Sequence, residues 1–195
     1  MDLNKLSLHN QEIAWAVLED TQVVRLWEEI GAKVNLVGSL KSGLLMKHRD
    51  IDLHIYTDEL SISDSFAVMA KLAEHPWIQD ITYRNLIRTE EACIEWHAWY
   101  EENNRDRWQL DLIHIRKGSL YDGVVERVTD AVVRKLTPET KEAILRIKYE
   151  LPEEVGFSGL QVYRAVLTGG ARTSREFWEW NEKNPFVGNV LDWRP

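Results

Sequence analysis

The sequence lacks the features of an exported or membrane-spanning chain. Its only cysteine is Cys93, so no disulfide can form within the chain, which fits a reducing compartment. No apolar run is long enough to cross a bilayer, and the first five residues lack the basic-then-apolar pattern of a signal peptide. We therefore expect a cytoplasmic protein in which Cys93 is a small buried residue of a strand.

An excess of positive charge is also missing. The chain has 24 Lys and Arg residues against 32 Asp and Glu residues, a formal net charge of -8. Because nucleic-acid affinity comes largely from Lys and Arg that neutralise phosphates, this balance argues against nucleic acid as a partner and suits a cationic small substrate better. There is no low-complexity segment, and a hydrophobic content of 44% provides enough apolar material for a core.

What is present is an alternation of helical and strand-like patterns, which predicts an α+β fold. Apolar residues at helical spacing over 10–30 predict one helix, or two joined near residues 20–21. The patterns that follow predict strands at 32–37, 50–57, 78–85, 92–100 and 108–115, with helices at 40–47 and 61–75. Since no helix separates the last three strands, we expect a mixed, mostly antiparallel sheet flanked by helices. Capping signals then predict a helical C-terminal third, with helices at 137–150, 159–167 and from Thr173 onward.

The most informative segment begins where the strand at 32–37 runs into Gly38-Ser39. Glycine lets the backbone approach a ligand closely, and Ser39 offers a hydroxyl. The start of the following helix offers free N–H groups, so this junction suits a phosphate. Gly38 and Ser39 are therefore candidate nucleotide-binding residues.

Two carboxylates follow on the next predicted strand. Asp50 and Asp52 are two residues apart, so their side chains project from one face of the sheet, together with His54. Adjacent carboxylates repel unless a cation lies between them, and Mg²⁺ prefers oxygen ligands that it often shares with phosphates. The pattern predicts a metal beside the phosphate site.

These motifs resemble those of the DNA polymerase β-like nucleotidyltransferase superfamily, in which a Gly-Ser pair, a helix and Asp-x-Asp follow one another. The small antibiotic-modifying members are the most similar in size and layout. The resemblance implies that Gly38 and Ser39 bind the triphosphate and that Asp50 and Asp52 coordinate divalent metal. It also implies a catalytic nucleotidyltransferase domain at 1–118, with a helical region at 119–195 packed on it.

The superfamily uses a third carboxylate in an apolar-Asp-apolar setting on a later strand. Leu110-Asp111-Leu112 fits this pattern best, with Asp80 and Glu95 as alternatives. The residues leave open whether Asp111 binds metal or acts as the general base. Lys47 and Arg49 are candidates for neutralising nucleotide phosphates, although a solvated loop is the alternative.

The resemblance implies that Asp50, Asp52 and Asp111 catalyse transfer of a nucleoside monophosphate to a hydroxyl of a small-molecule acceptor, for example an antibiotic, releasing pyrophosphate. The expected cofactors are two Mg²⁺ ions, and ATP is the expected nucleotide. The alternatives are a non-catalytic nucleotide-binding or regulatory module, an enzyme that extends RNA, and a toxin–antitoxin-type transferase that modifies a protein. For Trp96, Trp99 and Trp108 we expect core packing rather than stacking on a ligand.

Overall fold

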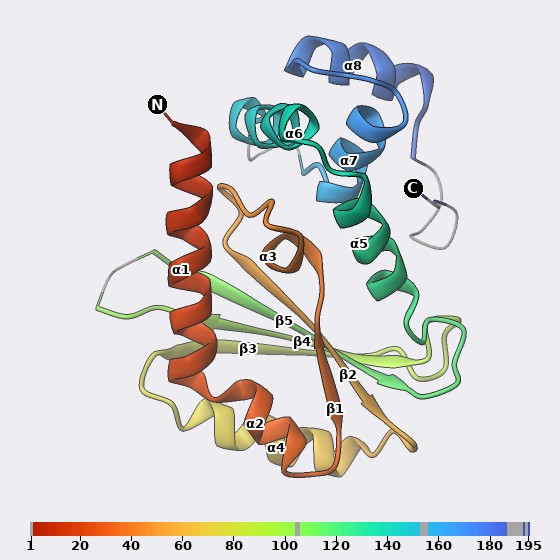
Figure 1. The fold of residues 1–195 in the computed structure, drawn as a ribbon. Helices are drawn as coiled ribbons and strands as arrows, with labels where there is room; N and C mark the ends of the chain where they lie inside the picture. Colours follow the sequence, from red (N-terminus) through yellow and green to blue (C-terminus); the bar gives the residue numbers. More distant parts are fainter. Residues whose placement is uncertain (1, 104–105, 153–155, 187–192, 194) are drawn as a thin grey trace. The chain divides into compact units, whose positions relative to one another are not determined.

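The structure is a computed structural model that describes the chain except residues 1, 104–105, 153–155, 187–192 and 194. The described residues form eight helices and five strands (Figure 1). They divide into two compact units that are interleaved along the chain. The sheet unit consists of residues 12–37 and 49–123, and the helical unit of residues 1–11, 38–48 and 124–195. The expected division into 1–118 and 119–195 stays a prediction.

The sheet unit contains all five strands, in the order β1-β2-β5-β4-β3. Strands β2 and β5 pair in parallel, and the other neighbours are antiparallel. The α+β class and the mostly antiparallel sheet are therefore confirmed. The strands span β1 Lys33–Leu36, β2 Asp50–Thr57, β3 Ile78–Asn85, β4 Cys93–Tyr100 and β5 Trp108–Arg116.

One face of the sheet is apolar because buried side chains alternate along the central strands. Ile51, Leu53 and Ile55 of β2 are almost completely buried, whereas Asp50 and Asp52, which precede Ile51 and Leu53, are partly exposed. Helices α2 (Val23–Glu28) and α4 (Ile62–Ala73) lie along one side of the sheet (Figure 1). The alternation thus gives the start of β2, and strands β4 and β5, a core face and a polar face.

Aromatic residues fix α2 and α4 to the apolar face. The ring of Trp27 in α2 meets that of His114 in β5 edge to face, and Trp96 Nε1 donates to Ser65 Oγ of α4 at 2.8 Å. Trp96 and Trp108 are buried, as expected, and Trp99 is half-buried beneath the guanidinium of Arg107. Packing, not ligand stacking, accounts for the two buried tryptophans.

Cys93 opens β4 and is buried as predicted. It packs in a small cluster with Tyr56 and Ile115. Burial, reinforced by the charges of Glu91 and Glu95, raises the pKa of the Cys93 thiol to about 11. Since the thiolate is the nucleophile, this cysteine is inert at neutral pH and serves the core.

The helical unit contains α3 (Gly38–Ser42), α5 (Val124–Lys135), α6 (Pro138–Glu150), α7 (Gly159–Leu167) and α8 (Ser174–Lys183), and it includes the start of α1 (Leu3–Thr21). Helices α6, α7 and α8 begin where the capping signals predicted, with the side chains of Thr137, Ser158 and Thr173 accepting backbone N–H bonds. Their inward faces form one core, which includes Ile144, Ile147, Val166 and Phe177. Helix α5 has no comparable cap in the sequence and was not predicted as a separate element.

Several expected boundaries differ from those observed. The helix expected at 40–47 is α3, which ends at Ser42 because Gly43 adopts a φ of 70°. The following residues Leu44, Leu45 and Met46 are fully buried, and Asn10 Nδ2 of α1 donates to the Met46 carbonyl at 2.7 Å. Helix α1 begins at Leu3, well before the expected start at residue 10.

Two further details concern helix ends. The segment 10–30 contains two helices, which confirms the second of the two alternatives predicted from the sequence. Gln22 separates them in a left-handed conformation with a φ of 51°. Ser61 caps α4, since its Oγ accepts the Asp64 N–H at 3.2 Å. Within the described residues, no helix is both long and apolar enough to span a membrane.

Candidate active site

Three aspartates come together on the polar face of the sheet. Asp50 and Asp52 lie on β2, and the parallel pairing of β2 with β5 places Asp52 directly opposite Asp111. Each offers a carboxylate oxygen, and these oxygens all lie within 4.8 Å of one another. All three residues are partly exposed.

This donor set fits a divalent metal. Three like charges in so small a volume repel, and a cation bound between them removes that repulsion. Carboxylate oxygens are the ligands that Mg²⁺ prefers, and accessible positions let it keep waters or bind a phosphate. Asp50, Asp52 and Asp111 are thus the residues that would hold the divalent metal that the resemblance implies.

The two alternative third carboxylates lie elsewhere. Asp80 is on the edge strand β3 and forms an ion pair with Arg107. Glu95 is on β4, opposite Ile113 rather than opposite an aspartate, and contacts His97. Of the three candidates, Asp111 is the one that the strand pairing brings to Asp52.

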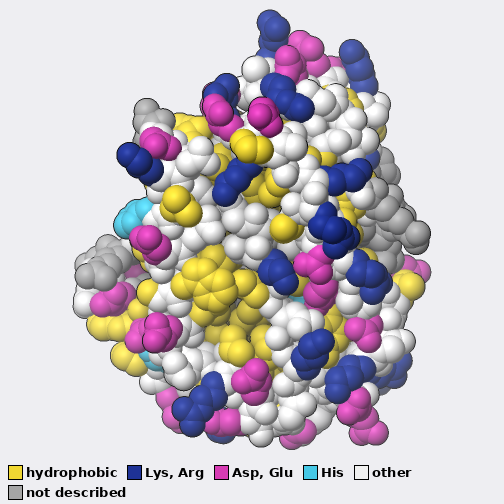
Figure 2. All heavy atoms as spheres, in the orientation of Figure 1, with side chains coloured by type: hydrophobic (Ala, Val, Ile, Leu, Met, Phe, Trp, Pro, Cys, Tyr) yellow, Lys and Arg dark blue, Asp and Glu magenta, His cyan; other side chains and the backbone are white. Residues whose placement is uncertain are grey.

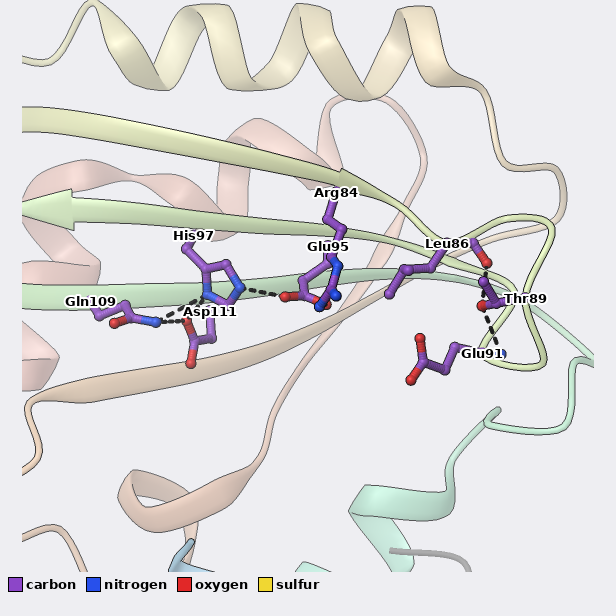
Figure 3. Close-up of polar contacts among 8 residues, drawn as sticks. All are labelled: Arg84, Leu86, Thr89, Glu91, Glu95, His97, Gln109 and Asp111. Atoms are coloured by element: carbon purple, nitrogen blue, oxygen red, sulfur yellow. Dashed lines mark hydrogen bonds and ion pairs between the residues drawn. The ribbon is translucent and has the colours of Figure 1, made fainter. Parts of the chain in front are cut away.

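Asp111 belongs to a short chain of polar contacts on β4 and β5 (Figure 3). Its Oδ1 lies 2.5 Å from His97 Nδ1 and accepts Gln109 Nε2 at 2.6 Å. His97 Nε2 in turn lies 2.6 Å from Glu95 Oε1. Burial alone lowers the pKa of His97, but the hydrogen bonds to Glu95 and Asp111 and their negative charges raise it above its usual value.

The sequence reasoning did not find His97. The available signal was the period-two alternation of β4, which places Glu95, His97 and Trp99 on the face that Asp111 occupies on β5. His54, which was expected to share the face of the aspartates, is buried with its Nδ1 3.3 Å from the Tyr56 hydroxyl.

His114 takes an ordinary place in the sheet. It is 1% exposed, on the apolar face, with its Nε2 2.7 Å from Thr57 Oγ1. Burial, partly offset by the charge of Asp64, lowers the pKa of His114 to about 4. It is a neutral core residue at physiological pH, away from the aspartates.

Gly38 and Ser39 open helix α3 in the helical unit. Gly38 has a φ of 67°, a conformation that glycine adopts without strain. The Ser39 hydroxyl is buried and lies 3.1 Å from the hydroxyl of Tyr163. Lys148 Nζ donates to Ser39 Oγ at 2.9 Å and to the Leu44 carbonyl at 2.8 Å. An ammonium group thus lies beside the predicted phosphate-binding serine.

Lys148 was also missed by the sequence reasoning. Lys148 and Ser39 are 109 residues apart, so no local pattern pairs them. Gly38 and Ser39 belong to the helical unit and the three aspartates to the sheet unit. That they act on one bound nucleotide stays a prediction.

The two basic residues proposed for phosphate binding have protein partners. Lys47 Nζ donates to the Leu151 carbonyl at 2.7 Å and lies over the ring of Tyr149. Arg49 forms an ion pair with Asp106 at 2.7 Å. The nucleotide-binding roles of Lys47 and Arg49 stay predictions.

Comparison with known proteins identifies the fold. No family model matches the chain, and no curated protein matches it. Among solved structures, a mutant of the Cid1 poly(U) polymerase bound to MgATP matches with a TM-score of 0.60 and 17% identity, over 82% of this chain and 50% of that one. The noncanonical poly(A) polymerase complex GLD-2–GLD-3 matches with a TM-score of 0.55 and 10% identity, over 100% of this chain and 68% of that one.

The chain has a nucleotidyltransferase fold. A cytoplasmic RNA terminal U-transferase also matches, with a TM-score of 0.52 and 16% identity, over 85% of this chain and 53% of that one. The chain therefore spans about half the length of the Cid1 and terminal U-transferase structures. At these identities the likeness shows the fold alone, which is that of the poly(A) and poly(U) polymerase structures. A closer relation to the small antibiotic-modifying members stays a prediction.

Proposed function

We propose that this protein is a metal-dependent nucleotidyltransferase. The observation that carries the proposal is the meeting of Asp50, Asp52 and Asp111 on one face of a sheet of this fold. In the reaction, the oxygen of an acceptor hydroxyl forms a bond to the α-phosphorus of a nucleoside triphosphate. The bond from that phosphorus to the pyrophosphate oxygen breaks, pyrophosphate leaves, and the hydroxyl proton passes to water.

The side chains divide this work between them. Asp50, Asp52 and Asp111 would hold two Mg²⁺ ions, which when bound polarise the phosphate and neutralise charge on the attacking and leaving oxygens. Ser39 and Lys148 supply a hydroxyl and an ammonium group for the phosphates. ATP is the proposed nucleotide, and Asp111 is proposed as a metal ligand because it shares the oxygen cluster of the other two.

The experiment that tests this proposal is nucleotide binding. Non-hydrolysable analogues of ATP, GTP, CTP and UTP are titrated with and without Mg²⁺ into the wild type, the Asp50→Asn/Asp52→Asn variant and an Asp80→Asn control. We expect Mg²⁺-dependent binding that is lost in the double variant and kept in the control, since Asp80 lies outside the cluster. Binding that is indifferent to Mg²⁺ or to the double substitution would contradict the proposal.

The proposed acceptor is a small hydroxylated molecule of the aminoglycoside or lincosamide kind. Its support is the net charge of -8, which favours a cationic substrate over a polyanion. On the face drawn in Figure 2, acidic and basic side chains are interspersed. The net charge therefore suits a compact cation better than a long phosphate backbone.

A second candidate acceptor is an RNA 3′ end. The specific observation in its favour is that the similar structures are described as poly(A) and poly(U) polymerases and a terminal U-transferase. This finding does not favour the expectation, based on net charge, that nucleic acid is not a partner. The two acceptors make different products and can be separated in one assay.

That assay incubates the protein and Mg²⁺ with each α-labelled triphosphate and either a panel of aminoglycosides and lincosamides or a short single-stranded RNA. We expect label in a small-molecule adduct and none in the RNA. Label in RNA would replace the first acceptor with the second. Label in a copurifying protein would favour a protein-modifying transferase, and no transfer despite Mg²⁺-dependent nucleotide binding would favour a binding module.

A further inference from the structure

Strands β4 and β5 carry a row of polar residues in which Glu95 and His97 lie beside the proposed metal ligand Asp111. The antiparallel pairing places His97 opposite Asp111, and Glu95 is two residues before His97 on the same face of β4. Figure 3 shows the three side chains in line, with the His97 ring between the two carboxylates. Their side chains are 21 to 25% exposed, so they lie at the surface of the sheet and not in its core.

The two carboxylate oxygens of Asp111 differ in the hydrogen bonds that they accept. Oδ1 receives both His97 Nδ1 and Gln109 Nε2, at 2.5 and 2.6 Å. Among the described residues, Oδ2 accepts no hydrogen bond. The terminal torsion of an aspartate is broad when nothing restrains it. Two donors on one oxygen fix that torsion and leave the other oxygen for a ligand.

The His97 ring is itself fixed from its far side. Glu95 Oε1 lies 2.6 Å from Nε2, while Nδ1 faces Asp111, so both ring nitrogens are engaged. Arg84 approaches the second Glu95 oxygen at 4.0 Å. Outer contacts of this kind orient the ligands of many metal sites, and their loss weakens metal binding.

We infer that His97, held in place by Glu95, is a positioning residue that fixes Asp111 with one carboxylate oxygen free to bind the metal. The inference rests on the proposed function, because it assigns His97 a task only if the aspartates bind a cation. A purely structural role, as a cross-strand pair between β4 and β5, would affect the stability of the sheet but not its affinity for metal.

A matched pair of substitutions separates the two roles. An asparagine amide at position 97 reaches about where Nδ1 lies and keeps a donor for Asp111, whereas a glutamine amide reaches about where Nε2 lies and keeps only the Glu95 contact. Mn²⁺ affinity is measured by electron paramagnetic resonance on the full chain without nucleotide. We expect His97→Gln to weaken Mn²⁺ binding about tenfold or more and His97→Asn to stay close to the wild type.

Controls define each outcome. His75→Gln alters a histidine of the same unit that pairs with Asp20, and it should leave Mn²⁺ affinity unchanged. Equal Mn²⁺ affinity in His97→Gln and the wild type, or equal losses in His97→Gln and His97→Asn, would overturn the positioning role. If His97→Gln does not fold by circular dichroism, His97→Leu, which also removes the donor to Asp111, is measured in its place with the same expected loss of Mn²⁺ affinity.

Failure of the proposed function has a different signature. If the wild type binds no Mn²⁺, or if Asp52→Asn binds it as tightly as the wild type, the aspartates do not form a metal site and the inference falls with them. If Asp52→Asn loses Mn²⁺ and His97→Gln does not, the metal site stands and only the positioning role is wrong.

Discussion

At the residue scale, Lys148 makes the sharpest prediction outside the aspartates. Its ammonium group donates to Ser39 Oγ and lies near the ring of Tyr163. Lys148→Met removes this charge and keeps most of the apolar stem. A charge-assisted hydrogen bond contributes about 1.5 to 3 kcal/mol, so we expect the dissociation constant of an ATP analogue to rise about tenfold to a hundredfold.

Isothermal titration calorimetry with Mg²⁺ present measures this change. The matched control is Lys135→Met, which removes an exposed lysine at the end of α5 and should leave binding unchanged. Unaltered affinity in Lys148→Met would show that the Ser39–Lys148 contact stabilises the helical unit without binding phosphate. Comparable losses in both variants would point to net charge alone.

The same scale shows what a sequence can reveal about a site. Asp50 and Asp52 were predictable because two residues on one strand share a face whatever the strand pairs with. Assigning Asp111 as the third carboxylate required the register of β2 with β5, which sequence patterns do not provide. Asp80 and Glu95 therefore remained alternatives. Contacts between residues far apart in sequence, such as Lys148 with Ser39, have no local pattern at all.

At the element scale, strands were easier to place than helix ends. Strand β2 was predicted with its observed bounds, because its buried residues alternate strictly at the start and Thr57 closes the pattern. Helices with side-chain caps, such as α6 at Thr137, were also found. Helix α3 was predicted too late and too long because Leu44, Leu45 and Met46 continue an apolar pattern after Gly43 has ended the helix.

Element pairing also explains why the polar contacts lie where they do. Strand β5 is the centre of the sheet, with β2 on one side and β4 on the other. Its Asp111 therefore meets carboxylates from β2 and the imidazole of His97 from β4 in a single row. An edge strand such as β3 has a neighbour on one side only and cannot receive ligands and supporting contacts from both.

At the scale of the whole molecule, the folding free energy should depend on pH through His114. Its pKa is about 6.5 unfolded and about 4 folded, because the folded state buries it. Well above pH 6.5 the His114 imidazole is neutral in both the folded and the unfolded state, so its titration contributes nothing to the folding free energy. As the pH falls from 6.5 to about 4, the unfolded state gains a proton that the folded state does not, and stability is lost, by up to about 3 kcal/mol.

His114→Gln removes this titration and keeps a group that can hydrogen-bond Thr57. Urea unfolding of wild type and variant at pH 7.5, 6.5, 5.5 and 4.5 measures the difference between them, which cancels the carboxylates common to both. We expect the wild type to lose stability relative to the variant as the pH falls over this range. Parallel curves for His114→Gln and the wild type would show that His114 reaches water in the folded state.

The stability contribution of His97 has the opposite pH dependence. Because its pKa is raised in the folded state, this contribution is fully present below its unfolded pKa and is lost as the pH rises through its folded pKa. In the same urea experiment, the stability that His97→Gln loses relative to the wild type should therefore shrink toward high pH.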